Sequence, residues 1–194
     1  MVNKMIGNFE NDIVNCLSVL QSGGIILYPT DTIWGIGCDA TNSISVQRIF
    51  QLKKREEKKS MIILVNDENM ISDYVSNPSV KILSYISSAK KPTTAIFKNA
   101  IHLPNNLINE DGSIAIRIVQ DDFCRELINQ LKKPVVSTSA NISGEKFPQN
   151  FTEISKEIKN GVDCIVQHRQ NDFSKSVPSS IIKLNENDEI DFIR

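Results

Sequence analysis

Apolar residues recur along the chain with a helical spacing in two early segments. Residues 8–20 carry an apolar side chain at every third or fourth position, which predicts a helix that ends at Gly23 and Gly24. Residues 41–53 repeat this spacing, and Ser43 is a candidate N-terminal cap for them. The pattern therefore predicts two amphipathic helices, each of which buries one face.

Short apolar runs bounded by proline, glycine or polar residues predict buried strands. Strands are expected at residues 25–28, 61–65, 93–97, 113–119, 134–138, 162–166, 180–184 and 190–193. Further helices are expected after a cap at Asn77, after a cap at Asp121, and over residues 152–159. Because strands and helices are interleaved without strict alternation, the predicted fold is α+β (mixed α/β), a twisted open mixed sheet flanked by helices, in a single domain over residues 1–194.

The composition is that of an ordinary globular domain. Hydrophobic residues make up 40% of the 194 positions, and 22 basic residues nearly balance 23 acidic ones, for a net charge of −1. A chain with this balance has no global attraction to nucleic acid, so any RNA contact has to come from a local basic patch.

The cysteines do not suggest a metal site. Cys16, Cys38, Cys124 and Cys164 form no Cys-x-x-Cys pair, and the chain has two histidines, so no metal site is predicted. Buried free thiols suit a reducing cytosol. The first ten residues lack an apolar run of signal-peptide length, and no run of 18 apolar residues occurs, so we expect a cytoplasmic protein that does not enter a membrane.

Hydroxyl groups and cations follow several of the predicted strands. Thr30 and Thr32 come directly after the first strand and can hold a small polar ligand, or they can be ordinary turn residues. Residues 53–59 hold five bases and two acids at the mouth of a buried strand, where Lys53 and Arg55 can bracket phosphates. A solvated charged loop is the alternative for this segment.

Arg117 lies in the middle of a predicted strand, on the same face as Ser113. A buried arginine is costly without a charged partner, which is either the carboxylate of a ligand or an Asp or Glu of the chain itself. Ser139 and Asn141 end another strand in a loop of small hydroxyl side chains, a setting that suits phosphates or a carboxylate but also suits a plain serine-rich loop. Residues 177–182 repeat this theme.

The chain contains neither a GxxxxGK[ST] phosphate loop nor a GxGxxG fingerprint, and its histidines have no recognisable catalytic context. A site built from hydroxyls, an amide and cations binds and orients its substrates rather than attacking them covalently. Such a site suits adenylyl transfer, which depends on proximity and charge neutralisation.

Taken in order, these segments resemble the YrdC-like threonylcarbamoyl-adenylate synthases over about residues 11–184. The matching positions are the glycine, tyrosine, proline and threonine motif at residues 23–37, Lys53 and Arg55 for Lys-x-Arg, Arg117 for the arginine strand end, Ser139 and Asn141 for Ser-x-Asn, and residues 178–180 for Pro-Ser-Thr. Each motif alone is weak, and their order and separation make the resemblance specific.

The chain departs from the family pattern at several positions. Trp34 replaces a tyrosine, Val119 replaces a proline, Ser60 replaces the proline of Lys-Pro-Leu, and residues 90–94 reduce a Pro-Gly-Pro-x-Thr segment. The resemblance implies that two of these regions, around Ser60 and at residues 90–94, contact ATP. The length fits the short members of the family, which lack a second C-terminal domain.

The resemblance implies that L-threonine, bicarbonate and ATP, with Mg²⁺, yield threonylcarbamoyl-AMP and pyrophosphate, which makes the chain a nucleotidyltransferase. Other proteins then transfer the threonylcarbamoyl group to the adenosine beside the anticodon of tRNA, and weak binding of tRNA itself is expected. The implied threonine-binding residues are Thr32, Arg117, Ser139, Ser179 and Ser180. The implied ATP-binding residues are Lys53, Arg55, Lys59, Ser113 and Asn141, and Lys53 and Arg55 are the implied catalytic residues.

Two other functions remain open at this point. The basic residues near Lys53 and Lys90 could serve a non-catalytic module that binds double-stranded RNA or tRNA, although aromatic residues are only 6% of the chain. A related enzyme that forms another carbamoyl-adenylate is the second alternative. Known enzymes of that kind are longer and carry zinc-finger cysteines, which are absent here.

Overall fold

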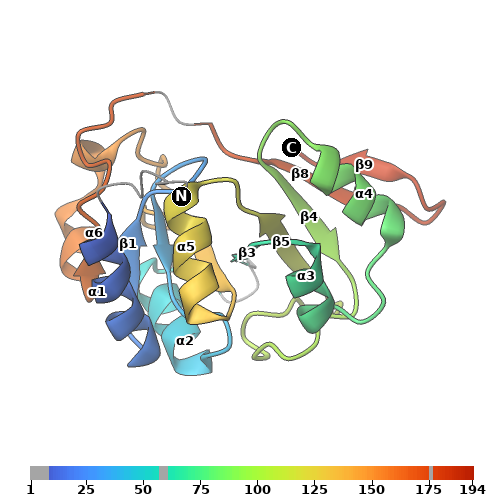
Figure 1. Cartoon of the computed structure of the whole chain (residues 1–194), viewed down its shortest axis with the longest axis horizontal. Coiled ribbons are helices and arrows are strands. Elements are labelled where there is room, and N and C mark those ends of the chain that lie inside the picture. Colours follow the sequence, from blue (N-terminus) through green and yellow to red (C-terminus); the bar gives the residue numbers. More distant parts are fainter. Residues whose placement is uncertain (1–8, 57–60, 175–176) are drawn as a thin grey trace, which may run out of the picture.

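A computed structural model describes residues 9–56, 61–174 and 177–194 (Figure 1). The helices are α1 (Glu10–Gln21), α2 (Ser43–Leu52), α3 (Glu68–Tyr74), α4 (Val80–Ser88), α5 (Asp122–Leu131) and α6 (Lys156–Asn160), with a short 3-10 helix η1 (Phe151–Glu153). The strands are β1 (Ile26–Tyr28), β2 (Gly35–Gly37), β3 (Ile62–Val65), β4 (Thr93–Phe97), β5 (Ile114–Ile118), β6 (Val135–Ser139), β7 (Cys164–Ile165), β8 (Ser180–Leu184) and β9 (Ile190–Phe192).

The nine strands of the described residues belong to one sheet with the order β7-β1-β2-β6-β3-β5-β4-β8-β9. The pairs β1·β7, β3·β5 and β4·β8 are parallel, and the other neighbours are antiparallel. The prediction of a mixed sheet flanked by helices is therefore confirmed. The strand order joins distant parts of the chain, since β6 lies between β2 and β3.

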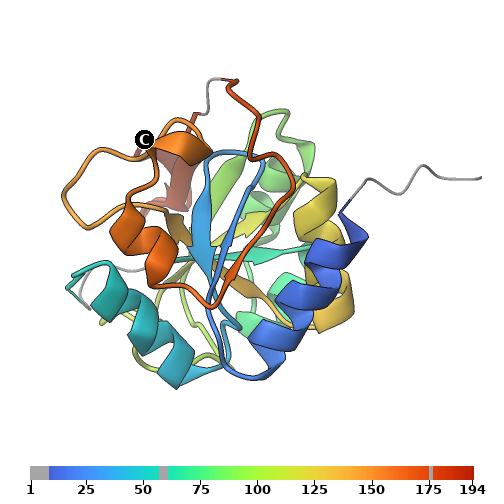
Figure 2. The ribbon, with the colours of Figure 1, turned by 90° about the vertical axis from the view of Figure 1, so that its left-hand side faces the viewer.

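The register of the strands sorts side chains onto two faces of the sheet. On one face lie apolar residues such as Ile36, Ile63 and Ile116, which form the larger core with α2, α3 and α4. On the other face, β1, β3 and β6 pack against α1 and α5. These two helices lie side by side, as both ribbon views show (Figures 1 and 2).

The second face becomes polar beyond the area covered by α1 and α5. Register places Ser137 and Ala115 beside Ile62, and it places Arg117 between Leu64 and Thr94. The loop between β1 and β2 and the chain segment before β8 contact this area, through the side chains described below. The fold therefore places a small polar area beside an apolar core.

Several local predictions were wrong for identifiable reasons. Asn42, not Ser43, caps α2 by accepting hydrogen bonds from two amides, and Ser79, not Asn77, caps α4. The helix expected at residues 152–159 is broken, because Ser155 caps α6 separately from η1. The pattern also missed α3 and β2. The predicted cap at Asp121 is confirmed, since its side chain accepts a hydrogen bond from the Cys124 amide.

Gly37 is needed because three strands approach one another closely at its position. A Cβ atom there would lie 2.4 Å from the Val136 carbonyl oxygen and 2.7 Å from Cε1 of Tyr28. We expect Gly37→Ala to lower the free energy of unfolding by about 2–3 kcal/mol, as overpacking against backbone does. Urea denaturation measures this loss. Gly35→Ala is the control: its nearest new contact is Ser137 Oγ at 3.2 Å, so a loss as large as that of Gly37→Ala would contradict the argument.

Candidate functional site

The buried arginine predicted for β5 has an acidic partner in the structure. Nη2 of Arg117 lies 3.0 Å from Oδ1 of Asp31, and both side chains are more than nine-tenths buried. Asp31 belongs to the loop between β1 and β2, and its Oδ2 accepts a hydrogen bond from the Gln120 amide at 3.3 Å. Of the two partners considered for Arg117, a carboxylate of the chain itself is thus present.

This ion pair leaves bonding capacity unused. Nε and Nη2 of Arg117 and Oδ1 of Asp31 are buried and make no hydrogen bond with any described residue. Buried donors and acceptors are normally paired, because an unpaired one loses its hydration without compensation. The site therefore presents two donors and one acceptor with which a charged ligand could pair.

Thr30 and Thr32 lie in a turn after β1 that their own polar groups close. Their Oγ1 atoms are 3.0 Å apart, and Thr30 Oγ1 also accepts from the Thr32 amide and donates to the Ile33 carbonyl. The turn therefore brings the two hydroxyls together. Both side chains are buried.

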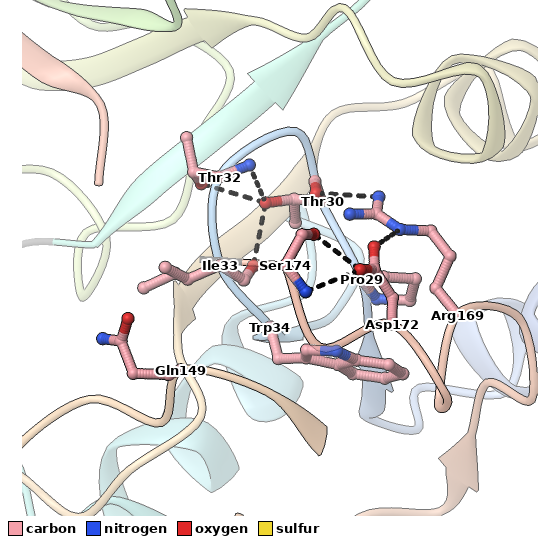
Figure 3. A pocket seen from close by; sticks show the side chains of 9 residues that line it. All are labelled: Pro29, Thr30, Thr32, Ile33, Trp34, Gln149, Arg169, Asp172 and Ser174. Atoms are coloured by element: carbon pink, nitrogen blue, oxygen red, sulfur yellow. Dashed lines mark hydrogen bonds and ion pairs between the residues drawn. The ribbon is translucent and has the colours of Figure 1, made fainter. Parts of the chain in front are cut away.

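A small pocket lies behind this turn, between the loop after β1 and the chain after β7 (Figure 3). Its volume is about 10 Å³, which is room for about one water molecule and too little for a substrate. Nη1 of Arg169 donates to the Thr30 carbonyl at 3.1 Å and to Asp121 at 2.9 Å, and its Nε lies 3.3 Å from Asp172. Arg169 thus fastens the turn to the start of α5.

Lys53 follows the last residue of α2, and its side chain is buried. Its Nζ donates to the carbonyl oxygen of Ser139 and, at 2.7 Å, to that of Asn141. Burial, reinforced by the nearby charge of Arg55, lowers the pKa of Lys53 to about 7. A protonated lysine has three N–H donors, so one remains for an anionic ligand.

The loop after β6 is held by Lys53 and by its own polar groups. The Ser143 amide donates to the Lys53 carbonyl at 2.7 Å. The Asn141 side-chain amide donates to the carbonyls of Ile142 and Glu145, while its Oδ1 is buried without a partner among the described residues. Both Asn141 donors are thus already engaged, and a hydrogen bond from Asn141 to phosphate would require this loop to rearrange.

The register of β8 distinguishes the two serines of the late motif. Ser180 pairs with Thr93, which places it on the opposite face from Arg117. Ser179 lies on the Arg117 face, where its Oγ is 2.8 Å from Oγ1 of Thr94. Arg194 donates to the Ser179 carbonyl from Nε and Nη2. Sequence alone could not choose between the serines, and strand alternation now favours Ser179.

The remaining predicted nucleotide ligands are less well placed or lie outside the described residues. Ser113 is buried at the start of β5, and its hydroxyl is bonded to Asp111 and Asn109. Arg55 is partly exposed after α2, and burial lowers its pKa. Lys59 and the departure at Ser60 lie outside the described residues.

Two groups of side chains therefore border the loop between β1 and β2. Asp31, Thr94 and Ser179 accompany Arg117, whereas Ser139 and Asn141 accompany Lys53. The backbone joins the groups, because Gly35 pairs with Ser139 and the Ala140 amide donates to the Trp34 carbonyl. Sequence reasoning missed Asp31 and Thr94; the need of Arg117 for a charged partner indicated a carboxylate nearby but not which one.

Metal and membrane features are limited in the described part of the chain. Within residues 9–56, 61–174 and 177–194, no group of three or more His, Cys, Asp or Glu side chains could hold a metal ion. No helix in these ranges has the length and apolar character needed to cross a bilayer. Cys16, Cys38 and Cys124 are buried free thiols, and Cys164 is partly buried.

Comparison with known proteins gives a consistent result. The family model Sua5_yciO_yrdC, described as telomere recombination, matches residues 18–194. A threonylcarbamoyl-AMP synthase of Idiomarina loihiensis is 31% identical over 146 residues, covering 74% of this chain and 78% of the relative. A Methanocaldococcus jannaschii protein, provisionally given the same name, is 36% identical over 201 residues, covering 99% and 92%.

Solved structures show the same fold. P. abyssi Sua5 complexed with L-threonine superposes with a TM-score of 0.84 at 20% identity, covering 95% of this chain. This chain spans 54% of that protein, so about half its length has no counterpart here. E. coli YciO superposes with a TM-score of 0.81 at 22% identity, covering 95% of this chain and 88% of YciO.

Proposed function

The chain belongs to the Sua5/YciO/YrdC family, and from this premise we propose that it synthesises threonylcarbamoyl-AMP. In the balanced reaction, L-threonine, bicarbonate and ATP give threonylcarbamoyl-AMP, pyrophosphate and water. The enzyme is thereby a nucleotidyltransferase. The names of the relatives support the product, and the P. abyssi complex supports the amino acid.

The observation that carries this proposal is the buried guanidinium of Arg117, which has two donor atoms without hydrogen bonds. A planar guanidinium matches the two oxygens of a carboxylate. We propose that Arg117 binds the carboxylate of L-threonine and that the hydroxyls of Thr32, Ser139 and Ser179 surround the polar groups of the substrate. The register of β8 is the reason for preferring Ser179 to Ser180.

The second group of residues is proposed to bind ATP. Lys53 and Arg55 supply positive charge for the triphosphate and for the pyrophosphate that leaves, and this neutralisation is their catalytic contribution. Asn141, Ser113 and Lys59 are proposed as further ATP contacts. Mg²⁺ would arrive as the counter-ion of ATP, because phosphate oxygens and water supply most of its ligands.

We further propose that the chain acts as one domain in the cytoplasm and passes its product to separate proteins that modify tRNA. One sheet runs through all the described strands, which supports a single domain. The net charge of −1 argues that any binding of tRNA by this chain is weak.

Omission of single substrates tests this function. Pyrophosphate release from ATP should require both L-threonine and bicarbonate, with serine and valine tested as alternative amino acids. Release that ignores threonine would favour an enzyme for another carbamoyl-adenylate. Absence of release, together with salt-dependent binding of tRNA, would favour the RNA-binding alternative.

Arg169 is expected to support the binding of L-threonine, because it stabilises the turn that carries Thr30 and Thr32. Arg169→Ala removes the donor to the Thr30 carbonyl, so we expect the KM for L-threonine to rise by roughly tenfold, the equivalent of one charge-assisted hydrogen bond, with little change in kcat. Steady-state kinetics measures both constants. Arg48→Ala is the matched control, because Arg48 likewise joins a backbone carbonyl, that of Gly23, to the carboxylate of Asp163. An equal rise in the control would refute this role of Arg169.

A further inference from the structure

The carboxylate of Asp31 lies beside Arg117, and the proposed binding of the threonine carboxylate by Arg117 assigns it no role. Its side chain is 8% exposed, and Oδ1 lies 3.0 Å from Nη2 of Arg117. The orientation of the two groups does not make this contact a hydrogen bond, so Oδ1 has no hydrogen-bond donor among the described residues. The other oxygen, Oδ2, receives a long bond from the Gln120 amide.

In an ion pair that only stabilises the fold, we would expect these atoms to form hydrogen bonds with each other. Arginine and carboxylate groups that stabilise a fold commonly form two parallel hydrogen bonds. Here the charges are adjacent, yet both partners keep buried atoms unpaired. The two charged groups are therefore held side by side, and each keeps hydrogen-bonding capacity that the other does not use.

The surroundings do not supply another use for the Asp31 carboxylate. The thiol of Cys124, at the start of α5, donates a hydrogen bond to the Pro29 carbonyl, and the Tyr28 hydroxyl donates to the Val136 carbonyl. Both groups are buried, and burial raises the pKa of each well above its usual value, so neither is an anion at neutral pH. The charged groups nearest to the turn after β1, Arg169 and Asp121, pair with each other at 2.9 Å, whereas Asp31 and Arg117 keep unpaired atoms.

An α-amino acid matches this pair. It carries a carboxylate and an ammonium group on the same carbon, so two adjacent sites of opposite charge bind both ends at once. We propose that Asp31 is a specificity-determining residue that binds the ammonium group of the amino-acid substrate, beside Arg117, which binds its carboxylate. This inference rests on the proposed function, and it adds the reason that an amino acid is selected over other small carboxylates.

The test compares two ligands that differ in one group. L-Threonine carries the α-ammonium, whereas the matching 2,3-dihydroxybutanoate carries a hydroxyl there and keeps the carboxylate and the β-hydroxyl. Isothermal titration calorimetry measures the binding of each to the wild type and to Asp31→Asn. We expect the substitution to weaken L-threonine by at least about tenfold and to leave the hydroxy acid unchanged or more tightly bound, because a negative charge beside its carboxylate is removed.

Asp39→Asn is the matched control. Asp39 is also a buried carboxylate in an ion pair, with Lys133 at 2.6 Å. Its backbone forms an isolated β-bridge with Val135, which lies at the opposite end of β6 from Ser139. This variant should bind both ligands as the wild type does. If Asp31→Asn does not fold, Asp31→Glu keeps the charge but moves it, and it should weaken L-threonine selectively.

The outcomes separate this inference from the proposed function. If the wild type binds L-threonine but Asp31→Asn weakens both ligands equally, Asp31 merely supports Arg117 and the ammonium role is wrong. Unchanged binding of L-threonine in Asp31→Asn also rejects the role. If the wild type binds no L-threonine in the presence of ATP, the proposed function fails, and this inference fails with it.

Discussion

Arg117→Ala is expected to abolish most of the synthesis of threonylcarbamoyl-AMP. Removing one partner of a buried, hydrogen-bonded charge pair costs about 2–5 kcal/mol of binding, which is a loss of roughly 30-fold to several thousandfold in kcat/KM for L-threonine. The same change leaves Asp31 as a buried charge without a partner. We therefore also expect the free energy of unfolding to fall by about 3–5 kcal/mol.

The two effects can be separated with a second substitution. Arg117→Ala combined with Asp31→Ala removes both buried charges, so most of the lost stability should return, while activity should stay low. Thermal unfolding followed by circular dichroism measures the first quantity, and pyrophosphate release measures the second. If activity returned along with stability, Arg117 would be a structural residue and not a substrate ligand.

Lys53→Met is expected to cause the second large loss of activity. Methionine has a similar length but cannot donate to the carbonyls of Ser139 and Asn141, and it carries no charge for the triphosphate. Loss of a positive charge from a phosphate-transfer site lowers kcat by roughly a hundredfold or more. Single-turnover assays at saturating ATP measure this loss. Lys54→Met is the control, because the neighbouring lysine is exposed and pairs with Glu157.

The pKa of Lys53 gives this prediction a pH dependence. At about 7, the pKa leaves roughly half of the side chains neutral near neutral pH, and a triphosphate beside Nζ favours the charged form. Binding of ATP should therefore take up protons at pH 7–8. Calorimetry in buffers of different ionisation enthalpy detects this uptake, which Lys53→Met should abolish.

The same pKa affects stability in a defined direction. The pKa of Lys53 is lowered from 10.5 in the unfolded chain to about 7 in the folded one, so the unfolded state binds more protons between these values. Its burial therefore costs most stability below about pH 7, and this cost falls as the pH rises toward 10.5. Relative to Lys53→Met, the wild type should gain stability across that interval.

Local pattern was enough to predict most of the fold. The strands β4 and β8 begin and end where the apolar runs do, and the cap at Asp121 follows from its side chain. The local pattern did not predict β2, because its Gly35–Gly37 segment has low strand propensity and depends on pairing with β1 and β6. The short helix α3 was missed because few of its residues are buried.

The candidate site shows a similar division. The position of Arg117 in the middle of a strand predicted that it needs a charged partner. No sequence pattern indicates which carboxylate lies beside it. Asp31 does so because the loop after β1 folds over the polar face. Likewise, the position of Lys53 suggested phosphate binding, whereas its contacts with the loop after β6 follow from tertiary packing.

The central claim is that this chain joins threonine, bicarbonate and ATP in one product, and mass spectrometry tests it most directly. The purified protein would be incubated with ATP, Mg²⁺, L-threonine and ¹³C-labelled bicarbonate. We predict a nucleotide product with the mass of threonylcarbamoyl-AMP that carries the ¹³C label, forms only when threonine is present, and is lost in Arg117→Ala. A product that lacks the label or forms without threonine would contradict the account, as would the absence of any adenylate.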